Sequence, residues 1–302
     1  FDIRKYLREF LSDRRVIEVN PIIWQIILNL FILNFRPSKT AKAYKEIWMN
    51  DKNMSPLLYY TQKQAEKISS SFSKENVVID FAMRYGNPSI NSKIHKLHEM
   101  GCENLVILPL YPQYAAATTA TVCDEVYRTL MKMRWQPSLK IIPHYESDPL
   151  YIDALVNSIN KKINEISWKP DLIIASYHGI PKKYFDKGDP YHCYCHKTTR
   201  LISEKFSSIK IKTTFQSRFG PQEWLQPYTD KTLENLPKEG VKNVLTICPG
   251  FASDCVETLE EIQIQAKESF LNSGGENFDM VPCLNDNSDH IILLKSLIER
   301  NI

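Results

Sequence analysis

Short runs rich in Val, Ile and Leu alternate with longer amphipathic stretches from about residue 75 to the end of the chain. Short apolar runs predict strands buried on both faces, and their alternation with helical patterns predicts parallel sheets covered by helices. Seven runs are predicted as strands: Val77–Ala82, Leu105–Leu108, Leu139–Pro143, Leu172–Ser176, Lys212–Phe215, Asn243–Cys248 and Phe278–Val281.

Apolar residues spaced three and four apart indicate the helices. The predicted helices are Phe1–Arg15, Pro56–Ser71, Ser89–Met100, Thr118–Met133, Pro149–Ile166, His192–Phe206, Pro227–Pro237, Ser253–Leu271 and Ser288–Glu299. A helix start at Ser147-Asp148-Pro149 splits the strands into two groups. We therefore expect an α/β protein with two units of similar design, 1–145 and 146–302.

Composition narrows the class of protein. The chain has 302 residues, 43% hydrophobic and 24% charged, an ordinary globular mixture for two domains. A formal net charge of +3 gives no electrostatic reason to expect nucleic acid as a partner. GxGxxG and GxxxxGK motifs are absent, which excludes the common dinucleotide and phosphate loops. Seven cysteines, an odd number, fit reduced thiols in a cytosolic compartment.

The longest apolar stretch is Ile22–Phe35, which Gln25, Asn29 and Asn34 interrupt. It is shorter and more polar than the roughly 20 apolar residues that cross a bilayer. A buried core helix is the favoured interpretation, and a helix lying in a membrane surface or lining an apolar cleft is the alternative.

Chemically reactive residues follow the predicted strands. In open parallel sheets, ligands bind beyond the carboxyl ends of the strands. The segments at these positions are Arg84–Pro88, Tyr111–Tyr114, Tyr177–Gly179, Gln216–Arg218 and Pro249–Asp254. Their tyrosines, histidine, arginine and acids suit a flat aromatic ligand with anionic groups and a metal.

His178 and an acidic helix are the strongest candidates for metal chemistry. His178 directly follows a predicted strand, although a lone histidine is often only structural. Asp254, Glu257 and Glu261 are spaced for one face of an α-helix, which is otherwise typical of a solvated face. Fe²⁺ accepts imidazole and carboxylate ligands together, so His178 and Glu257 are the hypothesised pair.

A second cluster, His192-Cys193-Tyr194-Cys195-His196, also resembles a metal site at first sight. It is not HExxH, and Cys-x-Cys lacks the usual spacing of structural zinc pairs. A metal role for Cys193 and Cys195 is therefore the minor alternative.

Several longer motifs follow one another along the chain. They are Leu108–Tyr114 with Thr118 and Thr119, Ser176–Pro181 with Gly188–Tyr191, Phe215–Arg218, and Cys248–Glu261. Together they resemble bacterial members of the ferrochelatase family, the haem-synthesis enzymes that insert ferrous iron into a porphyrin. The similarity extends over essentially the whole chain.

The resemblance implies two Rossmann-like domains with the porphyrin in the cleft between them. The last helix of the chain could pack back on the first domain. It implies that His178 and Glu257 act at the iron, with Asp254 and Glu261 continuing an acidic path. It implies that Ile22–Phe35 forms an apolar lip beside the cleft. Because a porphyrin partitions into membranes, we also expect a weak, reversible membrane contact through this segment. The residues that it places at the porphyrin are Arg84, Tyr85, Tyr111, Gln113, Tyr114 and Trp224.

The implied reaction is the insertion of Fe²⁺ into protoporphyrin IX with release of two protons, a lyase reaction in the cytoplasm or at the inner membrane. No cofactor besides the Fe²⁺ substrate is expected, nor a [2Fe–2S] cluster. The family opens with a strand and turn that have no counterpart here, and Ala116, Ala117 and Ala120 stand where it often has Ser or Gly. The alternatives are a chelatase for cobalt or coproporphyrin, a non-catalytic porphyrin carrier, and an α/β protein whose acidic helix is merely solvated.

Overall fold

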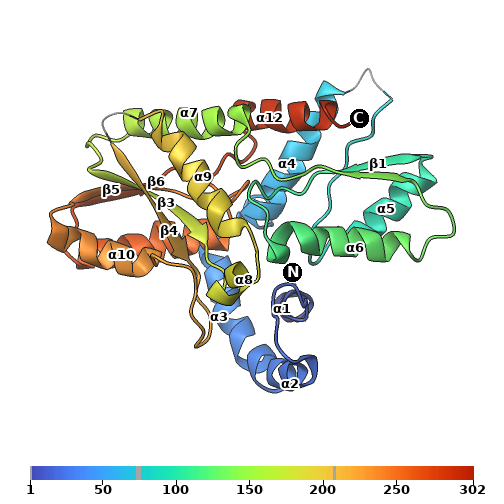
Figure 1. Cartoon of the computed structure of the whole chain (residues 1–302), viewed down its shortest axis with the longest axis horizontal. Helices are drawn as coiled ribbons and strands as arrows, with labels where there is room; N and C mark the ends of the chain where they lie inside the picture. The colour runs from blue at the N-terminus through green and yellow to red at the C-terminus, as the bar shows by residue number, and fades with distance from the viewer. Residues whose placement is uncertain (1, 73–75, 207–208) are drawn as a thin grey trace.

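The computed structural model describes residues 2–72, 76–206 and 209–302 (Figure 1). Within these residues the strands form two separate parallel sheets, β1-β2 and β4-β3-β5-β6. The strands are β1 (Asn104–Ile107), β2 (Ser138–Ile141), β3 (Leu172–His178), β4 (Lys210–Gln216), β5 (Asn243–Ile247) and β6 (Asn277–Met280).

Helices flank both sheets. The α-helices are α1 (Ile3–Leu11), α2 (Pro21–Ile27), α3 (Leu33–Ile47), α4 (Pro56–Ser71), α5 (Ile90–Glu99), α6 (Thr121–Leu130), α7 (Pro149–Glu165), α8 (Lys182–Asp186), α9 (Tyr191–Ser203), α10 (Thr229–Asn235), α11 (Lys267–Asn272) and α12 (Ser288–Glu299). In the described part of the chain, η1 (Leu28–Ile32), η2 (Ala116–Ala120) and η4 (Val256–Ala266) are π-helices, and η3 (Leu236–Glu239) is a 3₁₀-helix.

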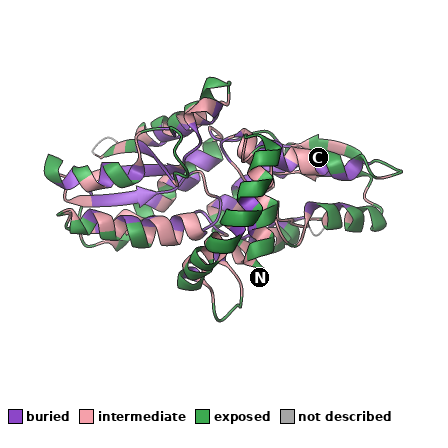
Figure 2. Ribbon diagram, turned by 90° about the horizontal axis from the view of Figure 1, so that it is seen from below, coloured by how far each residue is buried: buried purple, intermediate pink, exposed green. Residues whose placement is uncertain are grey.

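The four-stranded sheet has both faces buried, as the apolar runs predict. Ile173 and Tyr177 on β3 belong to one apolar cluster, and Ile174 between them belongs to the cluster on the opposite face. All three are fully buried, because side chains alternate across a strand and helices cover both sides. Figure 2 shows these buried strands between half-exposed helices. The predicted fold class, α/β with parallel sheets flanked by helices, is confirmed.

The prediction of a strand at Val77–Ala82 is wrong. Among the described residues this segment pairs with neither β1 nor β2. Val77 and Ile79 still pack partly buried against the larger core, and Asp80 forms an ion pair with Lys93 at 2.5 Å. An apolar run can therefore pack into the core without being a strand, because a strand also needs a hydrogen-bonded partner strand.

The helices predicted at Thr118–Met133 and Ser253–Leu271 both begin as π-helices. Each follows an extended residue, Ala115 or Cys255, whose backbone N–H donates to a threonine hydroxyl three residues on. The distances are 3.1 Å from Ala115 to Thr118 and 3.0 Å from Cys255 to Thr258. π-Helical segments are rare in proteins, and those that occur are often found at functional sites.

Candidate active site

A cavity of about 1320 Å³ lies between the two sheets. Its walls come from α1, the 76–85 segment, the ends of β1 and β3, and the start of η4. Seven of the predicted site residues line it: Arg84, Tyr85, Tyr111, Gln113, His178, Trp224 and Glu257. Tyr114, Asp254 and Glu261 are not among the lining residues. The cavity thus brings together residues from both halves of the chain.

His178 ends β3 and faces this cavity. Its Nδ1 lies 2.6 Å from the carbonyl oxygen of Gly179. Because a carbonyl only accepts hydrogen bonds, Nδ1 carries a proton, and in the neutral tautomer that this bond selects the lone pair is on Nε2. A Cβ at Gly179 would lie 2.9 Å from the Gln216 carbonyl oxygen, so glycine is required for this close approach.

Glu257 lies in the first turn of η4 and is half-buried. Its neighbours come from α1 and α3. They are Tyr6, Arg36 and Tyr44, none of which was predicted as a site residue. Burial raises the pKa values of Tyr6 and Tyr44, and the Glu257 carboxylate raises both further. Burial lowers the pKa of Arg36, and Glu257 opposes this. A cation and two phenols therefore share the surroundings of this carboxylate.

Glu261 is held by the turn that follows β4. Its Oε1 accepts a hydrogen bond from the backbone N–H of Ser217 at 2.7 Å, and its Oε2 accepts one from the Ser217 hydroxyl at 2.5 Å. Gln216 donates to the same carboxylate and to the Glu257 backbone carbonyl at 2.7 Å. Burial raises the pKa of Glu261, Ser217 and His178 lower it, and Glu257 raises it. His178, Glu257 and Glu261 therefore act on one another electrostatically.

Asp254 does not share a helical face with the other two acids, contrary to the prediction. It precedes η4 and is buried. Its carboxylate accepts hydrogen bonds from Thr258 at 3.0 Å and from Asn285 at 2.7 Å. The wider turn of a π-helix instead aligns Glu257 with Glu261, four residues later. The α-helical spacing behind the prediction does not apply here.

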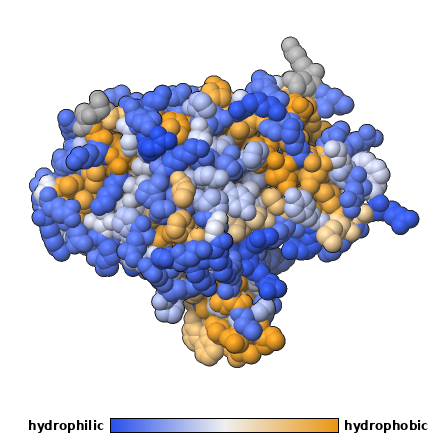
Figure 3. Space-filling model, viewed as in Figure 1, coloured by the Kyte–Doolittle hydropathy of each residue, from blue (hydrophilic) through white to orange (hydrophobic). Residues whose placement is uncertain are grey.

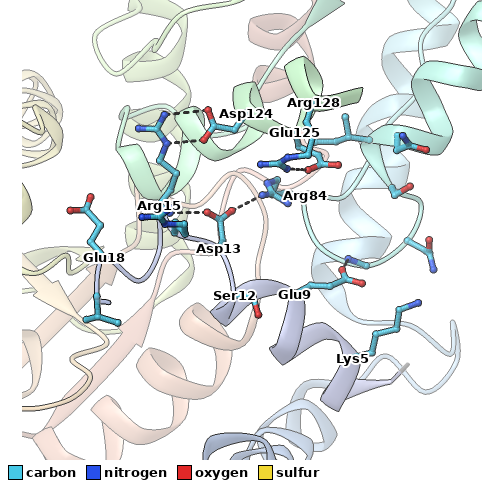
Figure 4. A pocket seen from close by; sticks show the side chains of 17 residues that line it. Lys5, Glu9, Ser12, Asp13, Arg15, Glu18, Arg84, Asp124, Glu125 and Arg128 are labelled. Atoms are coloured by element: carbon cyan, nitrogen blue, oxygen red, sulfur yellow. Dashed lines mark hydrogen bonds and ion pairs between the residues drawn. The ribbon is translucent and has the colours of Figure 1, made fainter. Parts of the chain in front are cut away.

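Arg84 and Tyr85 are anchored by Asp13, a residue that the motifs did not indicate. Arg84 Nη2 and Tyr85 OH lie 2.5 Å and 3.0 Å from Asp13 Oδ2, and the Thr121 hydroxyl bonds to the same oxygen. Figure 4 shows this ion pair in a second, charged pocket. The segment after α1 is thereby tied to Arg84, Tyr85 and the start of α6.

The other predicted porphyrin residues differ in accessibility. Gln113 is almost fully buried and donates to Thr198 at 3.0 Å. Trp224 is also buried, with its indole N–H donating to the Phe219 carbonyl oxygen at 3.0 Å. Tyr111 borders the cavity, whereas Tyr114 lies near Asp189 and outside the set of lining residues.

The cysteines of the His-Cys-Tyr-Cys-His segment do not converge. Cys195 is fully buried in the core, and Cys193 is exposed. Residues two apart on a helix point in different directions, so the two thiols share no site. No group of three or more His, Cys, Asp and Glu residues in the described part of the chain is arranged to hold a metal ion.

The favoured interpretation of Ile22–Phe35, a buried core helix, is wrong because much of the segment is exposed. Ile22, Leu30 and Phe35 are 74%, 60% and 73% exposed, whereas Leu28 and Leu33 pack inward. The segment protrudes at the lower edge of the molecule in Figure 3 as an apolar surface. Within the described residues, every helix is too short or too polar to cross a membrane.

Comparison with known proteins identifies the family. A family model described as ferrochelatase matches residues 1–302. The chain belongs to the ferrochelatase family. The ferrochelatase of Allorhizobium ampelinum is 56% identical over 303 residues, covering 99% of this chain and 88% of the relative. That of Francisella tularensis subsp. novicida is 49% identical, covering 99% and 90%. The resemblance to bacterial ferrochelatases is confirmed.

Solved structures also show the fold of this ferrochelatase-family chain. SirB from Bacillus subtilis, solved with Fe³⁺, matches with a TM-score of 0.58 at 12% identity, covering 82% of this chain and 91% of SirB. A multi-domain Deinococcus radiodurans protein with structural similarity to chelatases matches with a TM-score of 0.54 at 10% identity, covering 79% of this chain and 50% of that protein. The arrangement of sheets and helices is therefore that of chelatases.

Proposed function

We propose that this chain performs the family's reaction with His178 and Glu257 at the reacting metal. Ferrochelatases insert Fe²⁺ into protoporphyrin IX and release two protons, a lyase reaction of haem biosynthesis. The observation that supports the assignment is that an imidazole from β3 and a carboxylate from η4 line one cavity. Imidazole and carboxylate are ligands that ferrous iron accepts together.

His178 is proposed to receive the first pyrrole proton at Nε2. The hydrogen bond from Nδ1 to the Gly179 carbonyl leaves the Nε2 lone pair free, and neutral imidazole is a suitable base near pH 7. Glu261 is proposed to take part in removing the second proton, since burial raises its pKa and it senses the charges of His178 and Glu257. Asp254 is assigned a positioning role, because its carboxylate holds Thr258 and Asn285.

The cavity is proposed to hold the porphyrin. Its volume of about 1320 Å³ exceeds the roughly 300–1,000 Å³ of most small-molecule sites, which leaves room for a tetrapyrrole. Tyr85, Tyr111 and Trp224 supply aromatic walls, and Gln113 lines the cavity beside them. A site that fits a puckered macrocycle exposes the pyrrole lone pairs at a strain of about 1–5 kcal/mol. We assign no iron–sulfur cluster.

We also propose a division into domains 1–145 and 146–302. It is supported by the separate sheets and by the helix that begins at Pro149. The last helix, α12, packs against both α7 and α4, and so joins the two domains. The cavity between the sheets would then be the interdomain cleft.

The apolar lip Ile22–Phe35 is proposed to contact a membrane surface from the cytoplasmic side. Its exposed isoleucines are followed along the chain by the exposed Lys39 and Lys42 on α3. Apolar side chains beside basic ones favour shallow, reversible binding to anionic bilayers. Sedimentation with anionic vesicles should fall in an Ile22→Ser/Ile26→Ser variant and not in an Ile292→Ser control on α12. Equal sedimentation of parent and lip variant would refute the contact.

The decisive experiment for the function is anaerobic incubation with Fe²⁺ and protoporphyrin IX, followed by the Soret band. The proposal predicts conversion to the haem spectrum over many turnovers. Porphyrin binding with fluorescence quenching but no haem would instead identify a carrier. Faster conversion with Co²⁺ or with coproporphyrin would identify the corresponding chelatase.

A further inference from the structure

His192 and His196 lie one helical turn apart on α9. Their ring centroids are 4.4 Å apart, with the ring planes tilted by 49°. Residues four apart share one face of an α-helix, and two histidines at this spacing form half of many zinc sites. The pair therefore has the spacing of a bidentate imidazole ligand.

Aromatic packing holds the two rings in place. The His192 ring stacks on Phe215 at 5.7 Å between centroids, and its centroid lies 5.1 Å from that of Phe185. His196 lies 6.1 Å from the same Phe215 ring. Rings fixed by packing lose little further freedom when they bind a ligand, which favours affinity.

The nitrogens of the pair are available. Among the described residues, no group hydrogen-bonds to either ring. By contrast, His144 is bonded through both nitrogens, to Glu146 at 2.6 Å and to Tyr194 at 3.2 Å. Burial lowers the pKa values of His192 and His196, so at neutral pH both are in the neutral form that binds metals.

We propose that His192 and His196 together bind one borderline divalent transition ion, of the class of Zn²⁺, Ni²⁺, Co²⁺ and Fe²⁺, at a second site outside the active-site cavity. Neither residue lines that cavity. Imidazole nitrogens suit this class of ion and disfavour Mg²⁺ and Ca²⁺. Because the described residues offer no third protein ligand, water completes the coordination.

The test is a Zn²⁺ titration at neutral pH in a His178→Ala background, which removes the imidazole of the proposed insertion site. One Zn²⁺ per chain should bind, and His192→Gln or His196→Gln should each weaken binding at least about tenfold, or 1.4 kcal/mol. His95→Gln, which changes an exposed histidine on α5, should have no effect. Zn²⁺ should also raise the thermal midpoint of the His178→Ala protein but not that of the two pair variants.

Three results would overturn the proposal. Absence of Zn²⁺ binding in the His178→Ala background would show that the protein binds Zn²⁺ only at the proposed insertion site. Unchanged Zn²⁺ affinity in both pair variants would show that the ion binds elsewhere. Loss of binding in Cys193→Ser would assign it to the exposed thiol next to His192. His196 is exposed, so His196→Gln keeps the test valid even if His192→Gln fails to fold.

Discussion

The two π-helices η2 and η4 occupy corresponding places in the two halves of the molecule and carry different chemistry. Both follow an extended residue that is capped by a threonine hydroxyl, Thr118 in η2 and Thr258 in η4. Aligned on these threonines, Ala117 matches Glu257, and both residues line the cavity. The capped π-helix start thus occurs in both halves of the molecule, whereas only η4 carries the reactive carboxylates. Function here depends on side chains placed on a repeated structural element.

The largest expected difference between the two copies is in turnover. Glu257→Ala should lower turnover roughly 100-fold or more, a loss as large as that of an acid–base group, because it removes the carboxylate proposed to lie at the reacting metal. Ala117→Ser, at the matched position in η2, should leave turnover within about threefold, because a hydroxyl there adds no ligand or base. Steady-state haem formation measures both. Comparable losses in the two variants would show that the helices contribute equally.

A smaller difference is expected in stability. Thr258 is fully buried and bonds to both the Cys255 backbone and Asp254, whereas Thr118 is half-buried. Thr258→Val should therefore cost about 1–3 kcal/mol, since it leaves buried polar groups unpaired. Thr118→Val should cost about 1 kcal/mol, as for a lost cap. Urea unfolding gives both values, and a larger cost at Thr118 would contradict the comparison.

The smallest expected effect concerns pH. Burial raises the pKa of Glu261 above its ordinary value of 4.5, so the folded protein retains a proton that the unfolded chain has lost. Stability from this group is therefore lost as pH rises from 4.5 through the higher folded pKa. The unfolding free energy of Glu261→Gln, relative to the parent, should increase between about pH 4 and pH 7. An unchanged difference would show that the two states share one pKa.

The fold was predictable where each element could be inferred from its own residues. The strands β3 to β6 agree with the predicted runs within two residues at either end. In β3 and β5, nearly continuous burial leaves a continuous apolar signal. His178 could be found because it ends such a strand. Val77–Ala82 failed because strand pairing depends on a partner that the run itself does not specify.

The remainder of the site depends on tertiary contacts. Arg36 and Tyr44 lie near Glu257 because α3 packs against η4, and Tyr6 does so because α1 packs against α3. Nothing in the spacing of these residues shows this. The π-helix was missed because acids four residues apart fit an α-helix equally well. The exposed lip was mistaken for core because an apolar helix gives the same pattern whether it contacts protein or a membrane.

The central claim is that the imidazole of His178 removes a proton as the metal enters. The most direct measurement is anaerobic turnover of His178→Ala with Fe²⁺ and protoporphyrin IX, together with porphyrin affinity by fluorescence quenching and the thermal midpoint. The account predicts a fall in turnover of roughly 100-fold or more with affinity and midpoint preserved. Turnover within about threefold of the parent, in a folded variant, would contradict it.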